Sequence, residues 1–367
     1  MIEVENLIRI LKKSKVDFFT GVPDSILKKF SIYIDNYSQK KHVLATNEGS
    51  ATSIGIGYYL STKRIPCIYL QNSGLSNAIN PLISISSKEV YSIPLLLLIG
   101  WRGSPRQPDE PQHKAKGKIT TKLLKLLNIN FCILRKEKDL SKIQNLILKA
   151  YKNKKVVACL IEKNILKSKS KNFKKLRKNF ILRSEFIENF LKSIPKKSKI
   201  ISTTGYTSRE LLDIRKNKKI NNGEDFYMVG GMGHSASVSL GYALHSNKTV
   251  YCLDGDGSAL MHLGSLRTIG FLKNKNFKHI ILNNNSHESV GGQPTHFDGI
   301  NLEKFSKSIG YKNYFQIQNK FILKKILKKF LTSKGPSLLE VKIQNISLGN
   351  LSRPKNLIRI KENFMKK

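Results

Sequence analysis

Short apolar runs alternate with longer stretches of helical periodicity along the first part of the chain. Six runs are rich in β-branched, aromatic and leucine residues and are bounded by glycine, proline or polar residues, as buried strands are. They read VDFFTGVPD, HVLATNEGS, IPCIYLQNSG, IPLLLLIGW, NFCIL and VVACLIEK. The stretches between them place apolar residues three and four positions apart, which favours helices. This alternation predicts a parallel sheet with crossover helices.

The second part of the chain repeats the alternation with the runs KIISTTG, DFYMVGGMG, TVYCLDGDG, HIILNNNS and SLLEVKIQ. Between the two parts lies LKSKSKNFKKLRKNF, a basic stretch of low complexity that is typical of a solvated linker. We therefore predict an α/β protein with two domains, residues 1–165 and 183–367, joined by a linker at 166–182. Each domain has an ordinary size. The halves are expected to share a fold, although no sequence similarity between them is visible.

Composition narrows the classes of function. The chain has 367 residues and a formal net charge of +40, from 65 basic and 25 acidic residues. Nucleic-acid binding is one reading of that charge. We favour a general lysine bias, because the lysines are spread along the whole chain and neither an RNA-binding aromatic motif nor a zinc finger appears. The longest apolar run, SIPLLLLIG, is far shorter than the roughly 18 residues of a membrane span and suits a buried parallel strand.

The N-terminus and the cysteines favour a cytoplasmic protein. The segment MIEVENLIRILKKSKVDFF predicts an amphipathic helix and lacks the apolar core of a signal peptide. Cys67, Cys132, Cys159 and Cys252 are widely separated, lie in apolar runs and show no zinc-binding spacing. Such cysteines are typical of buried thiols in a reducing compartment. We expect no membrane partner and no nucleic-acid partner.

The stretch YCLDGDGSALMHLGS carries the first chemical signal. Asp256 stands between Gly255 and Gly257, after a predicted strand and before a predicted helix that Ser258 is suited to cap. Ligands of open α/β sheets bind at such strand ends, and glycine lets a ligand approach the backbone closely. A helix start favours phosphate, whereas an aspartate repels it unless a cation lies between them. The stretch therefore indicates a divalent metal and a phosphorylated cofactor, although Asp-Gly alone is also a common turn.

A second polar group follows the next predicted strand. Asn284 lies 28 positions after Asp256, a suitable length for one helix and one strand, and belongs to the run NNNS. In a parallel sheet the ends of neighbouring strands meet at one edge. A carboxylate, an amide oxygen and a backbone carbonyl would form half of the octahedral oxygen shell of Mg²⁺, with phosphate oxygens and water completing it.

The pattern GDGS followed by NN at this spacing resembles the signature of thiamine diphosphate-dependent enzymes. The resemblance implies that Asp256, Asn284 and the carbonyl of Ser286 hold Mg²⁺ against the cofactor diphosphate. It implies cofactor contacts for the stretch from Gly255 through Gly257 to Ser258. In MVGGMGHS it implies that Met232 supports the bent cofactor and that the Gly230 carbonyl faces its 4'-amino group.

The stretch HVLATNEGSATSIGIGYYL resembles the pyrimidine-binding domain of the same family, with Glu48 after a strand and opening a helix. A carboxyl group there can hydrogen-bond a ring nitrogen of the aminopyrimidine and favour the imino tautomer, whose nitrogen takes the proton from thiazolium C2. Read alone, Glu48 is an ordinary acid in a first helical turn. The resemblance also implies that the cofactor lies between the pyrimidine domain of one chain and the diphosphate domain of another, so that the protein self-associates.

Further motifs narrow the resemblance to one branch of the thiamine diphosphate-dependent decarboxylases. GVPDS, YLQNSGLSNAINPL, EVYSIPLLLLIGWRG, DEPQH, TTGYTSREL and NNNSHESVGGQPT together resemble the branch that acts on phosphonopyruvate, over nearly the whole chain. The resemblance implies two cofactor-binding domains without a middle domain, and decarboxylation of 3-phosphonopyruvate to phosphonoacetaldehyde and CO₂ in phosphonate biosynthesis. Sulfopyruvate as the substrate stays open. Where this branch usually has Gly and Ala, the chain has Asn285 and Ser286, which a backbone contact at 286 should tolerate.

Proton transfer and substrate binding need further side chains. His113 and His287 lie in predicted loops at strand ends and are candidate proton donors, and His234 is a weaker third. Arg102 and Arg106, in one predicted loop, are candidates to grip the phosphonate through planar multi-donor contacts. The polar residues expected to shape the pocket of the 2-oxo acid are Gln71, Asn72, Ser73 and Asn77.

Overall fold

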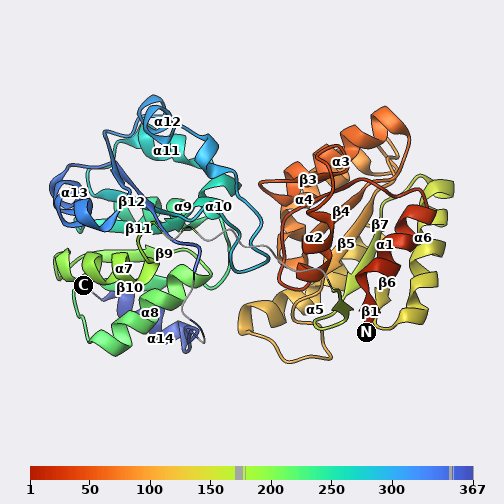
Figure 1. Cartoon of the computed structure of the whole chain (residues 1–367), viewed down its shortest axis with the longest axis horizontal. Helices are drawn as coiled ribbons and strands as arrows, with labels where there is room; N and C mark the ends of the chain where they lie inside the picture. The colour runs from red at the N-terminus through yellow and green to blue at the C-terminus, as the bar shows by residue number, and fades with distance from the viewer. Residues whose placement is uncertain (170–176, 178, 347–348, 350, 367) are drawn as a thin grey trace. The chain divides into compact units, whose positions relative to one another are not determined.

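The computed structural model contains two parallel six-stranded sheets, one in each half of the chain (Figure 1). The structure describes residues 1–169, 177, 179–346, 349 and 351–366. It divides into one unit of Met1–Phe173 with Val290–Gln293, and a second of Lys174–Ser289 with Pro294–Lys367. The predicted linker falls at this division. Its first residues, Leu166–Lys167, form strand β8, which pairs with β1 (Ile2–Glu3), and its residues 170–176 and 178 lie outside the described ones.

The first unit contains all six strands that the sequence predicts there. They are β2 (Phe19–Gly21), β3 (His42–Leu44), β4 (Cys67–Gln71), β5 (Leu96–Gly100), β6 (Asn130–Leu134) and β7 (Val157–Ile161), in the order β3-β2-β4-β5-β7-β6. Side chains alternate between two faces, as a strand requires. On β5, Leu96 and Leu98 join one core and Leu97 and Ile99 the other.

Helices cover both faces of this sheet. The helices α1 (Val4–Lys13), α2 (Lys28–Ile34) and α6 (Leu140–Asn153) pack on one face. The helices α3 (Glu48–Thr62), α4 (Leu75–Pro81) and α5 (Pro111–Leu126) pack on the other. The amphipathic N-terminal helix is therefore present as α1, beginning after two residues of strand. None of the helices in the described part of the chain is long and apolar enough to cross a membrane.

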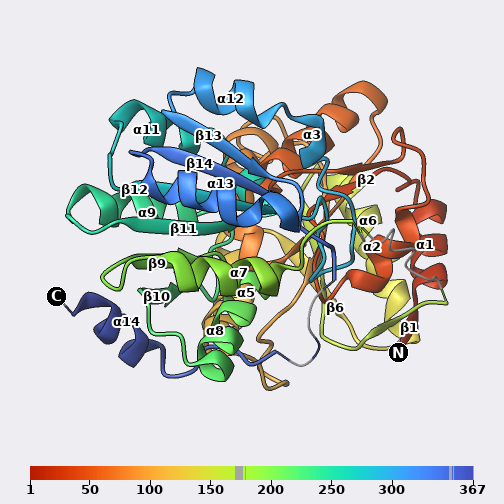
Figure 2. The same ribbon diagram turned by 60° about the vertical axis from the view of Figure 1, so that its left-hand side comes forward.

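The second unit has the same architecture, seen from a second side in Figure 2. Its strands are β9 (Lys199–Ser202), β10 (Glu224–Tyr227), β11 (Val250–Gly255), β12 (Phe277–Asn283), β13 (Asn313–Ile317) and β14 (Ser337–Lys342). The helices α7 (Arg183–Ser193), α8 (Tyr206–Lys218) and α13 (Lys320–Thr332) pack on one face. Those on the other face are α9 (Ser235–Leu244), α11 (Ser265–Leu272), α12 (Leu302–Ser308) and α14 (Leu357–Met365).

The two sheets share one strand order. The second unit runs β10-β9-β11-β12-β14-β13. Counted from the first strand of each sheet, both units place the strands as second, first, third, fourth, sixth and fifth. The expectation of a shared fold without visible sequence similarity is confirmed. In each unit the loops at the carboxyl ends of the strands are therefore the places where a ligand is expected.

The helix after β11 differs from its prediction. Helix α10 (Asp256–Met261) begins directly after Gly255, and His262–Gly264 separate it from α11. Ser258 thus lies inside the first turn, and the prediction that it caps the helix is wrong. Its hydroxyl instead accepts hydrogen bonds from the Gly233 N–H (3.1 Å) and the Thr203 hydroxyl (3.0 Å). These long-range partners replace the local cap.

Candidate active site

Asp256 and Asn284 come from neighbouring strand ends in the second unit. Asp256 directly follows β11 and Asn284 directly follows β12. The two strands are parallel neighbours, with Gly255 opposite Leu282. Both side chains are buried. The predicted convergence of these two residues on one edge of the sheet is confirmed.

The carboxylate of Asp256 lies in a polar but closed environment. Its Oδ2 accepts a hydrogen bond from the Thr295 hydroxyl at 2.5 Å. Burial raises the pKa of Asp256 to about 6, although the Thr295 hydroxyl, the Gly257 N–H and the charge of Arg183 oppose that rise. A buried carboxylate gains most from a bound cation, because the cation offsets the cost of losing water.

The amide of Asn284 is held at both ends. Its Nδ2 donates to Glu288 at 2.9 Å, and its Oδ1 accepts from the Ser286 N–H at 3.1 Å. The next residue, Asn285, has φ of +50°, in the left-handed region where glycine and asparagine are the residues best tolerated. The glycine that the family pattern leads one to expect at 285 is thus replaced by the residue next best suited to that backbone.

The glycine-rich segments of the second unit lie at the same strand ends as Asp256 and Asn284. A Cβ at Gly255 would meet open space, whereas one at Gly257 would lie 3.1 Å from the His287 ring. Ser258 ties the turn after β11 to the loop that carries Gly230 and Met232, both half-buried. Open space beside Gly255, together with oxygen ligands of the kind that Mg²⁺ prefers, fits a metal-bound diphosphate.

Two histidines that are candidate proton donors, His287 and His234, lie near the same strand ends in the second unit. Burial, with a smaller contribution from the charge of His296, lowers the pKa of His287 to about 4. His234 is exposed and its ring stacks on His262, with centroids 4.4 Å apart. His287 therefore carries a mainly neutral ring at neutral pH.

Glu48 lies where the sequence predicts it, at the first position of α3. The Asn47 side chain caps the helix by accepting from the Ser50 N–H at 2.8 Å. Glu48 is 5% exposed, and its Oε2 accepts from Asn77 Nδ2 at 2.8 Å. Its other oxygen lies against Gly74 so closely that a Cβ on that glycine would overlap it. The carboxyl group is thus fixed within the first unit by an amide on one side and a bare glycine on the other.

Asp24 is a second buried carboxyl group at the carboxyl-terminal edge of the sheet in the first unit, and the sequence analysis assigned it no role. It accepts hydrogen bonds from Gln71 Nε2 at 2.6 Å and from the Leu27 N–H at 3.0 Å. Burial raises its pKa against the opposing effect of these bonds and of Arg102. A Cβ on Gly100 would overlap its Oδ2. In the sequence, GVPDS contributes to the family resemblance but does not show a role for its aspartate, so only the fold reveals that this carboxyl is enclosed.

The two arginines that are expected to bind the phosphonate differ in their surroundings. Arg102 binds Asp109 with both Nε, at 2.7 Å, and Nη2, and its Nη1 donates to Ser25 at 3.3 Å. Burial acts to raise the pKa of Asp109, but the hydrogen bonds and charge of Arg102 outweigh it and hold that pKa below its ordinary range. Arg106 is exposed. Arg102 is therefore already engaged by a carboxylate, which the sequence analysis did not anticipate.

The polar residues of the first unit mainly organise its loops. Asn72 is buried and donates to the Arg102 carbonyl and to Thr120, both at 2.9 Å, and it accepts from the Arg102 N–H at 3.0 Å. Ser73 donates to Gln71 Oε1 at 2.7 Å. Asn72 thus has a clear structural role in joining two loops, beside its predicted contact with substrate. His113 lies half-buried in the first turn of α5, so the prediction that it lies in a loop is wrong.

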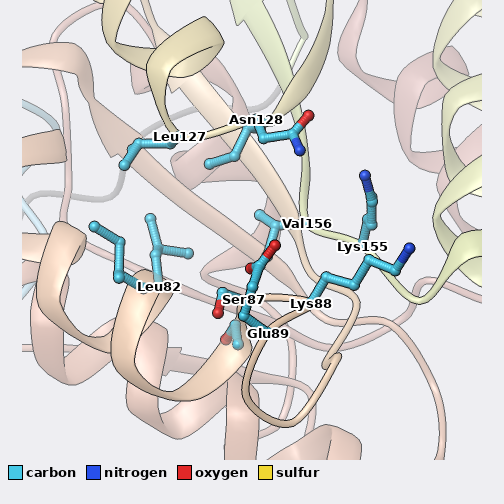
Figure 3. Close-up of a pocket in the computed structure, with 11 residues that line it drawn as sticks. Leu82, Ser87, Lys88, Glu89, Leu127, Asn128, Lys155 and Val156 are labelled. Atoms are coloured by element: carbon cyan, nitrogen blue, oxygen red, sulfur yellow. The ribbon is translucent and has the colours of Figure 1, made fainter.

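A shallow pocket in the first unit lies away from these residues (Figure 3). Its lining comes from the segment after α4 and from the residues directly before β6 and β7, including Leu82, Lys88, Asn128 and Lys155. This is the amino-terminal edge of the sheet, opposite the edge that carries Glu48. The pocket is therefore not part of the candidate site.

Two doubly wound domains of one topology, each with buried polar side chains at the carboxyl ends of its strands, belong to the class of α/β proteins that bind ligands at that edge. Residues 3–123 match the model of the thiamine pyrophosphate enzyme N-terminal binding domain, and residues 203–341 match that of the C-terminal binding domain. Among curated proteins, the chain is 32% identical to the phosphonopyruvate decarboxylase of Streptomyces viridochromogenes, over 97% of this chain and 92% of that one.

Two further relatives extend the comparison. The phosphonopyruvate decarboxylase of Streptomyces hygroscopicus is 31% identical over 97% of this chain and 91% of its own length. The sulfopyruvate decarboxylase of Methanosarcina acetivorans is 27% identical over 95% and 92%. The chain belongs to the thiamine pyrophosphate-dependent enzymes, in the group that contains these decarboxylases. The fold class predicted from the sequence, two cofactor-binding domains that are each a mainly parallel sheet flanked by helices, is confirmed.

Proposed function

We propose that the protein decarboxylates 3-phosphonopyruvate to phosphonoacetaldehyde and CO₂, with thiamine diphosphate and Mg²⁺, as a step of phosphonate biosynthesis. The observation that carries the proposal is the similarity to two phosphonopyruvate decarboxylases over nearly the full length of all three chains. Because the chain belongs to this enzyme family, the hypothesis that its basic charge reflects a non-catalytic, nucleic-acid-binding function is the weaker one.

In the second unit, Asp256, Asn284 and the Ser286 carbonyl would hold Mg²⁺, and the turn from Gly255 to Ser258 would contact the diphosphate. Thiamine diphosphate, when bound, supplies the electron sink that no side chain provides for the carbanion left by loss of CO₂. Met232 would support the cofactor and the Gly230 carbonyl would accept from its amino group.

In the first unit, the Glu48 carboxyl would hydrogen-bond the aminopyrimidine. Asn77 fixes one of its oxygens, and the other, beside Gly74, would face the cofactor. His113 and His287 are the proposed proton donors to the reacting carbon. A mainly neutral ring, such as that of His287, carries one N–H and one acceptor nitrogen, and it can donate the N–H proton while the acceptor nitrogen takes up a proton from solvent water.

The phosphonate would meet the loop of Arg102 and Arg106. Arg102 keeps guanidinium N–H groups beyond those that Asp109 and Ser25 occupy, because it has five donors in all. Asp109 holds the guanidinium group of Arg102 in one orientation, which lowers the entropic cost of binding a second anion. Asn72 and Ser73 would complete the binding loop.

Assembly and location complete the proposal. The cofactor would lie between the first unit of one chain and the second unit of another, so the active form would be a self-associated one. All four cysteines are free thiols, and burial raises the pKa of Cys67 and Cys252. Free thiols suit the reducing cytoplasm, which is the location we propose.

One experiment tests the substrate. Purified protein with thiamine diphosphate and Mg²⁺ is given phosphonopyruvate and sulfopyruvate side by side, and both CO₂ and aldehyde are measured. We expect the larger kcat/KM on phosphonopyruvate. The similarity to a sulfopyruvate decarboxylase over most of both chains makes sulfopyruvate the second candidate. Faster turnover of sulfopyruvate would replace the proposal with that one, and no CO₂ from either acid would remove both.

A further inference from the structure

A buried ion network lies beside the proposed metal ligands in the second unit. Arg183, the first residue of α7, donates from Nη1 to Glu210 Oε1 and from Nη2 to Glu288 Oε2, both at 2.6 Å. The three side chains are 5%, 1% and 3% exposed. Buried charges are costly unless they are paired, so a network of this kind persists where the surrounding fold requires it.

One oxygen atom of Glu288 connects the ion network to Asn284, a proposed metal ligand. Glu288 Oε2 accepts from Arg183 and also from Asn284 Nδ2. An ionised carboxylate accepts hydrogen bonds and donates none. The end of the Asn284 amide that faces Glu288 must therefore be its NH₂, and the amide oxygen must point the other way, where the Ser286 N–H meets it.

We propose that Glu288, held by Arg183, is a positioning residue that orients the Asn284 amide with its oxygen toward the metal. This inference rests on the proposed function, since it assumes that the site binds Mg²⁺. Asparagine can ligate a hard cation only through its oxygen, and a flipped amide would exchange the positions of its oxygen and its NH₂. Glu288 at one end and the Ser286 N–H at the other both disfavour the flipped amide before the metal arrives.

The competing explanation is that the network only pins α7 and α8 to the loop after β12. Glu210 provides the control that separates the two, because it bonds the other branch of the same guanidinium. In the described part of the chain, no hydrogen bond joins Glu210 to Asn284. Glu288→Gln and Glu210→Gln remove the same charge from the same arginine, and only the first weakens the partner of the metal ligand.

The test measures metal binding directly. Each full-length variant is saturated with thiamine diphosphate and titrated with Mn²⁺, and free Mn²⁺ is followed by electron paramagnetic resonance. We expect Glu288→Gln to raise the Mn²⁺ Kd about 10- to 100-fold, the usual effect of losing a partner of a metal ligand. Glu210→Gln should keep a Kd close to that of the wild type. Both should lose thermal stability, since each removes one charge partner of a buried arginine.

Several outcomes would overturn the inference. An unchanged Kd in folded Glu288→Gln would do so, and so would equal weakening in both variants, which would assign the network to the fold. If Glu288→Gln does not fold, Glu288→Asp keeps the charge but draws it back from Asn284, and the same rise in Kd is required of it. Wild-type protein that takes up no Mn²⁺ with the cofactor would instead contradict the proposed function itself.

Discussion

Glu48 is the residue whose role can be tested most directly. Glu48→Gln is nearly isosteric and leaves Asp256 and Asn284, in the other unit, untouched. If Glu48 drives the aminopyrimidine chemistry, the variant should keep its fold and lose turnover by about 10²- to 10⁴-fold, the usual contribution of a positioned proton-transfer group. Hydrogen–deuterium exchange at thiazolium C2 should slow with it.

The opposing reading treats Glu48 as an ordinary acid at a helix start. That reading predicts at most about 1 kcal/mol of lost stability and near-normal turnover. Exchange at C2 and turnover are therefore measured on the same cofactor-loaded sample. Normal exchange in the folded variant would exclude the catalytic role of Glu48.

Asp256 is the charged ligand of the proposed metal site, so its removal should uncouple the cofactor from Mg²⁺. Thiamine diphosphate with Mg²⁺, at a hundred times its Kd, should stabilise the wild type by about 2.7 kcal/mol. Asp256→Ala should show little of that stabilisation in thermal melts. Its stability without ligands should hardly fall, because the change removes a buried carboxyl whose pKa burial already raises. An undiminished ligand effect would show that Asp256 is not a ligand.

At the scale of elements, the short turn η1 (Asn72–Gly74) and the following α4 shape the space around Glu48. Gly74 has φ of −92°, so alanine is allowed by its backbone, but the added Cβ would overlap the Glu48 carboxylate. Gly74→Ala should displace that carboxylate and lower turnover by about tenfold or more, as misplacement of a positioned group does. The measurement is kcat at saturating cofactor.

Gly57, inside α3, provides the matched control. A Cβ there meets nothing within 4 Å, and alanine is the better helix former by roughly 0.8–1 kcal/mol. Gly57→Ala should raise the melting temperature and leave turnover unchanged. A Gly74→Ala enzyme as active as Gly57→Ala would mean that the position of Glu48 is not critical.

Local patterns were sufficient to predict most of the elements. Eleven of the twelve strands in the two large sheets match apolar runs, because a buried parallel strand is a continuous apolar segment. Asp256 and Asn284 were predictable in position, since each directly follows a strand, and Glu48 was predictable as the first residue of the helix after β3. The missed strand, β13 (NYFQI), is half-polar and mostly half-buried, so its sequence lacks that signal.

Long-range partners account for what the sequence did not show. Ser258 is a good local cap by type, but its hydroxyl is taken by Gly233 and Thr203, which are far away in the sequence. The pairing of Arg183 with Glu288 joins residues 105 positions apart. No periodicity or motif reports such a contact, and it becomes visible only when the sheet brings α7 and the loop after β12 together.

For the whole molecule, the net charge of +40 has its own testable consequence. If this charge reflects composition rather than a nucleic-acid function, DNA binding should be weak, independent of sequence and steeply reduced by salt, since it would arise from counterion release alone. Fluorescence anisotropy with two unrelated duplexes, at low and at physiological salt, measures this. Tight binding that distinguishes the two duplexes at physiological salt would restore the nucleic-acid reading.

Self-association is tested by mixing two inactive variants. If the cofactor lies between the first unit of one chain and the second unit of its partner, a mixed dimer of Glu48→Gln and Asp256→Ala has one site with both changes and one unchanged site. Random exchange of equal amounts in a two-fold dimer makes half of the dimers mixed, so activity should return to about a quarter of the wild-type value.

The same mixture discriminates against the alternative arrangement. If each site were built from one chain alone, every site would carry one of the two changes, and mixing would restore nothing. Chain exchange is confirmed independently by mass spectrometry of differently tagged variants, so that a lack of activity cannot be attributed to a lack of mixed dimers. Mixed dimers without recovered activity would contradict a cofactor site shared between chains. A fully active monomer in sedimentation at the assay concentration would contradict it as well.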